Sequence, residues 1–520
     1  MTDPFNGELH SELIIGLVNA VGTENKLVID LLKERLGRAG YSVVSVKVSN
    51  DVIPLLYDVP PHGDDQFKRI SDLMDAGNEA RATAKNDSVL ALGVAAWISA
   101  RRASDKDESP LPLPKTAVIV DSLKRPEEVE QLRLIYPSGF ILIGVHADVD
   151  RRRRHLAEDR GMTVEKANEL IRRDGEESKV DHGQRVNKTF HMADFFVEIS
   201  DNYGRLRGDV QRMVELWFGN PFITPTFDEH AMFLAFAAAL RSADLSRQVG
   251  AVVTRDSQIL STGANDCPKA GGGLYWPIRH PDSSCIDDTP HGRDYLRPEG
   301  DTNREEQIRI ISQIVEEGKK AEYGLDEEKL RALLSKSRIS DLTEFGRVVH
   351  AEMEALLCCS RNGLSTVGTT LYSTTFPCHN CAKHIIASGV ERGVYVEPYP
   401  KSKALQYHDD SITTVAEKAS GVEGRVKFEA FVGIGPRRFF DLFSMDLGSS
   451  YPLIRKIKET GKKKEWRIEE SQLRIKMSPV SYLELELQAC TIFGKAQQPH
   501  ENQEENHERE GSPPANCQGN

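Results

Sequence analysis

The sequence predicts an α/β protein with two domains. The chain has 520 residues, 39% of them hydrophobic, and a chain of this length normally divides into more than one hydrophobic core. Short apolar runs alternate with amphipathic stretches over the first 220 residues, which is typical of parallel strands joined by helices. Prolines at 221 and 225 then interrupt the pattern, and a second α/β pattern begins. We therefore expect domains at 1–220 and 221–495, the second with an insertion at 268–345.

The first domain alternates strand and helix signals in order. Continuous apolar runs without alternation predict strands that are buried on both faces of a parallel sheet. Strands are expected at 12–18, 41–48, 115–120, 140–145 and 193–199. Helices are expected after the first strand up to residue 36, at 66–84, at 87–101, after each later strand and up to residue 217.

The second domain begins with a helix and a hairpin around Asp256-Ser257, which are turn-forming residues. The expected helices are 228–240, 304–318, 326–337, one from Ala351, and 378–388, and the expected strands are 250–255, 258–262, 369–374 and 393–397. Residues 496–520 lack apolar periodicity, so we expect a disordered tail there.

The charge balance limits the class of partner. The chain carries 67 basic and 79 acidic residues, a net charge of -12, which argues against stable DNA binding but not against a small anionic substrate. Eight cysteines in so long a chain indicate reduced thiols and not a disulfide framework. No signal peptide and no apolar stretch of roughly 20 residues is evident, so we expect a cytoplasmic protein without membrane association.

Two short motifs carry the decisive chemistry: His350-Ala351-Glu352 and Pro377-Cys378-His379-Asn380-Cys381. Two thiolates three residues apart at a helix start can face one ion, and the free N–H groups there favour the thiolate form. The imidazole of His350 completes three protein ligands and leaves a fourth position for water, as in catalytic zinc sites. We predict one catalytic Zn²⁺ on His350, Cys378 and Cys381. A structural zinc knuckle is the alternative, but the His-Ala-Glu triplet favours catalysis.

This H-x-E and P-C-x-x-C arrangement resembles the zinc-dependent nucleobase deaminases. Residues 226–440 resemble the deoxycytidylate deaminase family through the blocks at 227–240, 245–253 and 261–268. The resemblance implies that Glu352 is the catalytic proton carrier and that Asn265 binds the sugar hydroxyl. The backbone groups of Ala351 and Thr375 are expected to contact the edge of the base. A homo-oligomer is also implied.

The whole chain resembles two-domain bacterial anti-phage dCTP deaminases, with matching blocks at 397–404 and 433–440. That resemblance implies conversion of dCTP to dUTP, which removes a precursor of phage DNA, and restraint by a regulatory nucleotide or RNA. Candidate cations for a triphosphate are Lys401, Lys403, Arg437 and Arg438. The alternative is that the lysines are solvated and the arginines form a subunit contact. A dCMP substrate stays open.

The first domain has a phosphate-binding signal between a strand and a helix, at 16–25. It departs from the P-loop pattern because Gly16 and Gly22 are one residue too far apart and Thr23 replaces the lysine. Asp121, at a strand end, is a candidate magnesium ligand. Residues 121–155 resemble nucleoside monophosphate kinase relatives. We expect a degenerate P-loop kinase-like domain that binds a nucleotide, followed by a cytidine deaminase-like α/β/α domain.

Other functions stay open. A polynucleotide deaminase would share the zinc site, but it needs a basic, aromatic-lined groove, and the chain is acidic with 7% aromatic residues. A nucleotide kinase, a dCMP deaminase of pyrimidine metabolism and a nucleotide-binding scaffold without catalysis are further alternatives. Four residues of the insertion could form a second, structural metal site, although irregular spacing favours unliganded side chains: Cys267, His280, Cys285 and His291.

Overall fold

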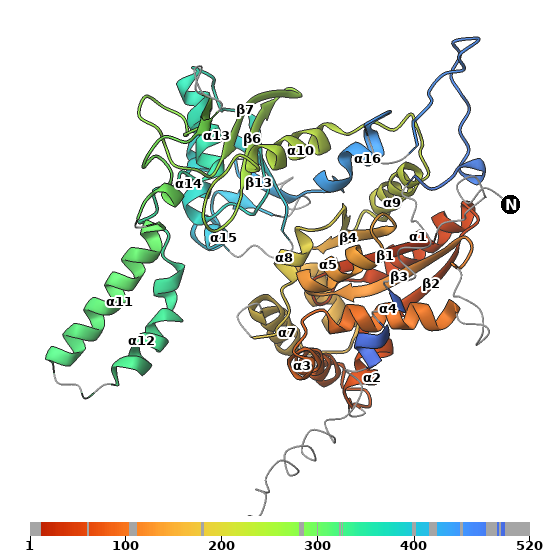
Figure 1. The fold of residues 1–520 in the computed structure, drawn as a ribbon, viewed down its shortest axis with the longest axis horizontal. Coiled ribbons are helices and arrows are strands. Elements are labelled where there is room, and N and C mark those ends of the chain that lie inside the picture. Colours follow the sequence, from red (N-terminus) through yellow and green to blue (C-terminus); the bar gives the residue numbers. More distant parts are fainter. Residues whose placement is uncertain are drawn as a thin grey trace, which may run out of the picture. The chain divides into compact units, whose positions relative to one another are not determined.

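The protein folds into two compact units, seen in a computed structural model (Figure 1). Unit 1 is Met1–Thr224 with Arg437–Asn520, and unit 2 is Pro225–Pro436. The structure describes residues 12–59, 62–102, 112–177, 181–279, 285–298, 300–321, 324, 326–397, 402–414, 424–447, 451–474, 486–487 and 490–494. In these ranges no helix has both the length and the apolar character needed to cross a membrane. The predicted tail at 496–520 lies outside them.

Unit 1 is built around a parallel sheet with strand order β5-β4-β1-β3-β2. Its strands are β1 (Leu13–Asn19), β2 (Ser42–Lys47), β3 (Thr116–Leu123), β4 (Phe140–Ala147) and β5 (Phe195–Ile199). Every residue of the central strand β1 is buried, as its continuous apolar run predicts. The predicted strands are confirmed with small shifts at their ends.

Helices precede and follow these strands. They are α1 (Asn25–Arg38), α2 (Ile53–Leu56), α3 (Gln66–Ala84), α4 (Val89–Arg102), α5 (Pro126–Ile135), α6 (Val149–Arg154), α7 (Val164–Glu176), α8 (Val186–Phe190), α9 (Tyr203–Trp217) and α16 (Phe439–Phe443). Alternation of strand and helix in the chain makes each connection a crossover, which is what keeps the strands parallel. The carboxyl ends of β1, β2 and β3 therefore lie along one edge of the sheet.

The C-terminal segment belongs to unit 1, which corrects the prediction that 221–495 forms one domain. Arg438 donates a hydrogen bond to the Phe140 carbonyl at 2.7 Å and lies 3.7 Å from the Asp194 carboxylate. The Arg474 backbone N–H donates to the Trp217 carbonyl at 2.8 Å. Buried polar contacts of this kind depend on residues far apart in the chain, so they leave no local signal in the sequence.

Unit 2 contains a mixed sheet with strand order β12-β13-β11-β10-β6-β7. The hairpin of β6 and β7 is antiparallel, β6 also runs antiparallel to β10, and the remaining pairs are parallel. The strands of this sheet are β6 (Gly250–Arg255), β7 (Gln258–Ala264), β10 (Thr369–Ser373), β11 (Val390–Tyr395), β12 (Ile412–Thr413) and β13 (Val426–Ala430). The short strand β14 (Gly433–Ile434) is not part of it.

The helices of unit 2 are α10 (Phe227–Ala239), α13 (Ala351–Arg361), α14 (His379–Ala387) and α15 (Ala404–Tyr407). The insertion holds a two-residue hairpin, β8 (Ile278–Arg279) and β9 (Ile286–Asp287), and the helix pair α11 (Thr302–Lys320) and α12 (Glu327–Ser335). This pair extends away from the sheet of unit 2 (Figure 1). The predicted helices of the insertion are thereby confirmed.

Candidate active site

Three metal-binding side chains meet where two helices of unit 2 begin. His350 is the N-cap of α13 and Cys378 the N-cap of α14, while Cys381 lies in the first turn of α14. The His350 Nδ1 atom lies 3.4 Å from the Cys378 sulfur and 3.3 Å from the Cys381 sulfur. A tetrahedral zinc with bonds of about 2.1 Å to nitrogen and 2.3 Å to sulfur separates its ligands by roughly 3.6 Å. The donor set therefore fits one zinc ion.

The two thiols differ in acidity. A hydrogen bond from the Cys381 thiol lowers the pKa of Cys378 to about 3, and the His350 imidazole adds to this effect. The same contact with Cys378, together with burial, raises the pKa of Cys381. The contact with Cys378 also raises the pKa of His350. The arrangement thus favours an ionised sulfur beside the imidazole.

Glu352 lies in the first turn of α13, directly beside the cluster. Its carboxylate is buried, with 3% of the residue exposed, and accepts a hydrogen bond from the Cys381 thiol at 3.4 Å. Burial raises the pKa of Glu352, and the negative charge of Cys378 adds to the effect. A buried carboxyl group beside a metal site can serve as a general acid–base catalyst.

Strand β7 holds α13 in place through a glycine. A Cβ atom added at Gly263 would lie 2.1 Å from the Ala351 carbonyl oxygen and 2.5 Å from the Ala355 nitrogen. The Ser261 hydroxyl donates to the Ala355 carbonyl at 2.7 Å. The backbone of the helix therefore rests directly on the strand, and this close approach sets the position of His350.

A cavity of about 170 Å³ opens beside the cluster. It gathers most of the predicted active-site residues: Asn265, His350, Ala351, Glu352, Thr375 and Cys378. Asn265 is buried and already engaged, because its Oδ1 accepts from the Val249 N–H at 2.7 Å and its Nδ2 donates to the Arg247 carbonyl at 2.8 Å. One amide hydrogen of Asn265 stays available for a ligand.

Of the predicted phosphate-binding cations, those that the structure describes do not line this cavity. Lys403 is exposed, and its ammonium group lies 3.1 Å from the Tyr407 hydroxyl. Lys401 lies outside the described residues. Arg437 is exposed in unit 1. Arg438 is buried in unit 1 against Asp194, so the prediction that it binds a substrate phosphate is wrong: its guanidinium holds the C-terminal segment to that unit.

Sequence reasoning missed other residues of the cavity. The loop before β6 contributes Asp244, Ser246 and Arg247, and the insertion contributes Asp294, Asp301 and Asn303. The loop residues stand within or beside a block that resembles the deaminases, so a signal existed. The insertion residues have no spacing that points to the site, because their position depends on how the insertion folds.

The cysteines and histidines of the insertion do not gather among the described residues. The Cys267 thiol donates to Asp294 at 3.4 Å, and burial raises its pKa to about 11. Cys285 and His291 are exposed. His280 lies outside the described ranges. Cys267, Cys285 and His291 thus do not join a group of three potential metal ligands within those ranges.

In unit 1, the predicted phosphate loop differs from expectation. Gly16 lies inside β1, where an added Cβ would approach Leu123 to 2.7 Å, so it packs the core and does not bound a loop. Gly22 occupies the turn with a φ of +84°. The Thr23 hydroxyl donates to the Ala20 carbonyl at 2.8 Å, and the Asp174 carboxylate accepts from the Val21 N–H at 2.7 Å.

A cavity of about 660 Å³ lies at the carboxyl edge of β1, β2 and β3. Asp121, which accepts from the Asn25 amide at 2.7 Å, lines it together with Lys47. Lys124 also lines it and donates to the Asn19 carbonyl at 2.7 Å. A lysine from the segment after β3 thus reaches the end of β1, where the sequence lacks the usual P-loop lysine.

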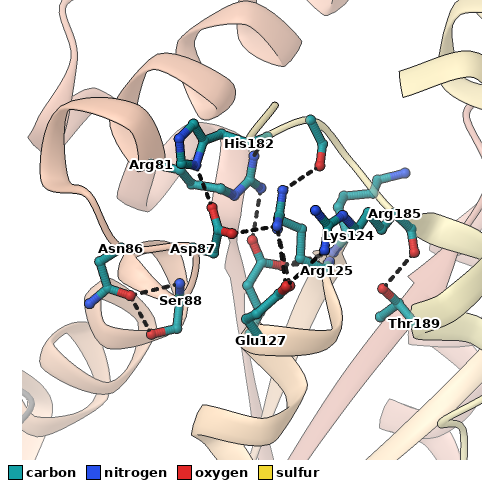
Figure 2. Close-up of polar contacts among 12 residues, drawn as sticks. Arg81, Asn86, Asp87, Ser88, Lys124, Arg125, Glu127, His182, Arg185 and Thr189 are labelled. Carbon is teal, nitrogen blue, oxygen red and sulfur yellow. Dashed lines mark hydrogen bonds and ion pairs between the residues drawn. The ribbon is translucent and has the colours of Figure 1, made fainter. Parts of the chain in front are cut away.

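A charge network is formed by residues of α3, α5 and the segments beside them (Figure 2). Two of its members, Arg81 and Glu128, line the cavity. Arg81 pairs with Glu128 at 2.8 Å. Arg125, whose side chain is fully buried, pairs with Asp87 at 2.5 Å and with Glu127 at 3.1 Å. The network ties the α3–α4 turn to the start of α5.

Comparison with known proteins finds relatives of the part of the chain that contains this site. Residues 225–397 match the family model of the cytidine and deoxycytidylate deaminase zinc-binding region. The chain is 33% identical over 172 residues to a deoxycytidylate deaminase of Enterobacteria phage T4, covering 33% of this chain and 77% of that protein. It is 31% identical over 174 residues to a deoxycytidylate deaminase of Mycobacterium phage D29, and the match covers 33% of this chain and 94% of that protein. A structure of a dCMP deaminase from cyanophage S-TIM5, in complex with dCMP and dUMP, aligns with 19% sequence identity and a TM-score of 0.22. The alignment covers 40% of this chain and 99% of that one.

Proposed function

Because this chain belongs to the cytidine and deoxycytidylate deaminase family, we propose that unit 2 hydrolyses the cytosine base of a free deoxycytidine nucleotide to uracil and ammonia. The observation that carries the proposal is the cluster of His350, Cys378 and Cys381 with Glu352 buried beside it, all bordering one small cavity. Several relatives carry the name deoxycytidylate deaminase, which supports a nucleotide substrate.

Zinc is the proposed cofactor, held by His350, Cys378 and Cys381. The spacing of these donors suits a tetrahedral ion with one position left for a non-protein ligand. Bound there, zinc would supply Lewis-acid activation of water at neutral pH. A closed structural site needs a fourth protein ligand, and none joins the three in the described part of the chain.

Glu352 carries the protons in the proposed reaction. Its carboxylate accepts a proton from the water that attacks C4 of the base and passes it to ring N3. Glu352 then takes the proton of the new C4 hydroxyl group and delivers it to the amino group, so that the C4–N bond breaks, ammonia leaves and the C4 carbonyl of uracil forms. The raised pKa of Glu352 suits both steps, since the group must hold and release a proton near neutral pH. Asn265 and the backbone of Ala351 and Thr375 would position the nucleotide.

We propose dCTP as the substrate, with dCMP as a second one, and dCTP depletion as an anti-phage role. This rests on the resemblance of the 397–404 and 433–440 blocks to anti-phage dCTP deaminases. The triphosphate needs more positive charge than the described lining of the cavity provides, so further cations, for example from a neighbouring subunit of a homo-oligomer, would supply it. The role in defence is tested by infecting cells that express either the wild-type protein or Glu352→Gln.

Substrate profiling tests the proposal. Zinc-loaded wild-type protein is incubated with dCTP, dCMP, deoxycytidine, CTP and a cytosine-containing oligonucleotide, and ammonia and uracil products are quantified. We expect turnover of the free deoxynucleotides and none of the oligonucleotide. Turnover of the oligonucleotide alone would favour a polynucleotide deaminase, and no turnover of any substrate in the zinc-loaded protein would refute the proposal.

Unit 1 supports a second function, binding of a regulatory nucleotide. Its cavity of about 660 Å³ lies at the carboxyl edge of parallel strands, where open α/β sheets bind ligands, and has the size of a nucleotide site. Lys47 and Lys124 are cations there, and Asp121 is a candidate metal ligand. The Asp174 carboxylate accepts a hydrogen bond from the Val21 N–H, in the loop after β1 where a kinase would bind phosphate. A phosphate would have to compete with this carboxylate, which argues against an active kinase.

Equilibrium binding tests this second function. Titration of the wild-type protein and Lys124→Gln with ATP, GTP, dTTP and dUMP, monitored by calorimetry, should give binding that weakens in the variant. Lys68→Gln, which changes an exposed lysine of α3 that does not line the cavity, is the matched control. Absence of binding by the wild-type protein, or equal affinity in Lys124→Gln, would contradict the assignment.

A further inference from the structure

Residues 455–467 concentrate positive charge in a chain that is acidic overall. They contain seven lysines and arginines and two glutamates, a net charge of +5, whereas the whole chain carries -12. They lie in the C-terminal stretch that belongs to unit 1, and Figure 1 shows them in blue, in a loop that extends away from the sheet of that unit. We call this segment the basic hairpin. Neither the proposed deaminase site nor the cavity of unit 1 includes it.

The basic hairpin folds back on itself as two short antiparallel stretches. Lys456 and Lys463 form an antiparallel bridge, and the Ile457 N–H donates a hydrogen bond to the Lys462 carbonyl at 2.8 Å. Gly461 stands at the turn with a φ of +68°, a conformation that favours glycine. The segment is therefore a narrow two-stranded ribbon.

Both ends of the basic hairpin are fixed to unit 1. At its start, the Arg455 Nε donates a hydrogen bond to the Pro221 carbonyl at 2.7 Å. At its end, the indole N–H of Trp466 donates to the Phe218 carbonyl at 3.2 Å. The charges between these two anchors are held in place before a ligand arrives, so little backbone entropy is lost when one binds.

The lysines of the basic hairpin carry charge that the described protein does not neutralise. No hydrogen bond or ion pair joins the ammonium groups of four exposed lysines to any residue that the structure describes: Lys456, Lys458, Lys462 and Lys464. Lys463 lies 4.1 Å from the centre of the Phe222 ring, a cation–π contact that leaves its charge in place. Like charges directly opposite each other in a ribbon, such as Lys456 and Lys463, are destabilising. An anionic ligand would relieve this repulsion.

These lysines are distributed over both faces of the ribbon. Residues directly opposite each other share a face, and successive residues alternate between faces. Lys456 and Lys463 are therefore on one face, and the two neighbours of Lys463, Lys462 and Lys464, are on the other. A flat anionic surface, such as a membrane, contacts only one face. A groove with negative charge along both walls contacts both faces at once.

The major groove of double-stranded DNA has this property. It is about 12 Å wide, admits a two-stranded β-ribbon and runs between two phosphate backbones. The major groove of A-form RNA is deep and narrow, so a ribbon fits it less well. Lysine contacts to phosphates release condensed counterions, which stabilises the complex at low salt without depending on the base sequence.

We propose that the basic hairpin is a docking surface for double-stranded DNA, which it binds through phosphates of both strands without reading the bases. The net charge of the whole chain argues against tight binding, so the interaction depends on this local charge and weakens steeply as the salt concentration rises. The inference goes beyond the proposed deaminase function and does not depend on it, because the hairpin belongs to unit 1.

The test measures binding of the full-length protein to a fluorescent DNA duplex of about 20 base pairs, by anisotropy over a series of salt concentrations. The double variant Lys462→Gln/Lys464→Gln removes two unpaired charges of the hairpin, and Lys188→Gln/Lys427→Gln removes two exposed lysines elsewhere as the matched control. The slope of log affinity against log salt should become shallower by about 2 in the hairpin variant, with affinity reduced roughly 50-fold at about 0.1 M salt. The control should bind like the wild-type protein.

A second measurement needs no variant. Lysines of the wild-type protein are acetylated with and without the duplex and quantified by mass spectrometry, and DNA should protect Lys462 and Lys464 but not Lys188. Circular dichroism verifies that the variants are folded, and a duplex RNA of the same sequence and phosphatidylserine vesicles are tested in parallel. Absence of DNA binding by the wild-type protein, equal affinity in the two double variants, or tighter binding of the RNA or the vesicles would overturn the inference. Loss of deaminase activity alone would concern only the proposed function.

Discussion

Replacing Gly263 with alanine should disrupt the metal centre without touching a ligand. The new Cβ would lie 2.1 Å from the Ala351 carbonyl oxygen, so even a tight contact of 3.0 Å requires a shift of about 0.9 Å in α13 or β7. Helix α13 begins at His350 and carries Glu352, whereas the two cysteines lie on α14. Zinc sites tolerate deviations of about 0.2 Å in ligand distance, and a 1 Å misplacement costs on the order of 100-fold in rate.

We therefore expect Gly263→Ala to lose most of its zinc and at least about 100-fold in kcat/KM, with unit 1 unaffected. Zinc is measured by atomic emission after dialysis, and activity by ammonia release from dCMP. Gly208→Ala in α9 is the control, because an added Cβ there meets nothing within 4 Å. Full zinc occupancy together with wild-type activity in Gly263→Ala would show that the close approach does not set the position of His350.

Three further outcomes are expected. Glu352→Gln should retain zinc and lose roughly 100- to 10,000-fold in kcat, because it removes the proton carrier; comparable kcat values would contradict that role. Burial alone would raise the pKa of Asp87, but the hydrogen bond with His182 and the charge of Arg125 hold it below its ordinary value. The ionised carboxylate therefore stabilises unit 1 above about pH 4, and this contribution to stability is lost as the pH falls below that. Asp87→Asn should therefore flatten the decline in thermal unfolding temperature between pH 5 and 3, and an unchanged slope would argue against the pair. Arg438→Gln should destabilise unit 1 by about 3 kcal/mol in denaturant unfolding and leave the KM for nucleotides unchanged, whereas a raised KM with normal stability would restore a phosphate role.

The sequence alone was enough to anticipate the core of the site because its key residues are encoded locally. His350 and Cys378 each precede a helix, and Cys381 follows one turn later, so three ligand positions depend on two helix starts. The five parallel strands of unit 1 and the strands β6, β7, β10 and β11 of unit 2 were also predictable, since continuous apolar runs and the hairpin turn at Asp256-Ser257 are local patterns. The short strands β12 and β13 were not predicted.

What the sequence could not predict depends on contacts between distant segments. The predicted phosphate role of Arg438 failed because the Asp194 that engages it lies 244 positions earlier in the chain. Gly16 was interpreted as part of a loop because the spacing of glycines does not reveal where a strand ends. The residues of the insertion that border the cavity carry no periodic signal, since loop positions are set by the fold around them.

The division of unit 1 into two stretches of chain has a consequence for synthesis. Unit 2 interrupts the sequence of unit 1, and the segment from Arg437 onward supplies buried contacts to the first sheet. On the ribosome, the first 224 residues emerge without these partners, and all of unit 2 must follow before they become available. Unit 2 can therefore finish folding while the nascent unit 1 is still incomplete, and a stop codon placed soon after residue 436 would spare the later unit and damage the earlier one.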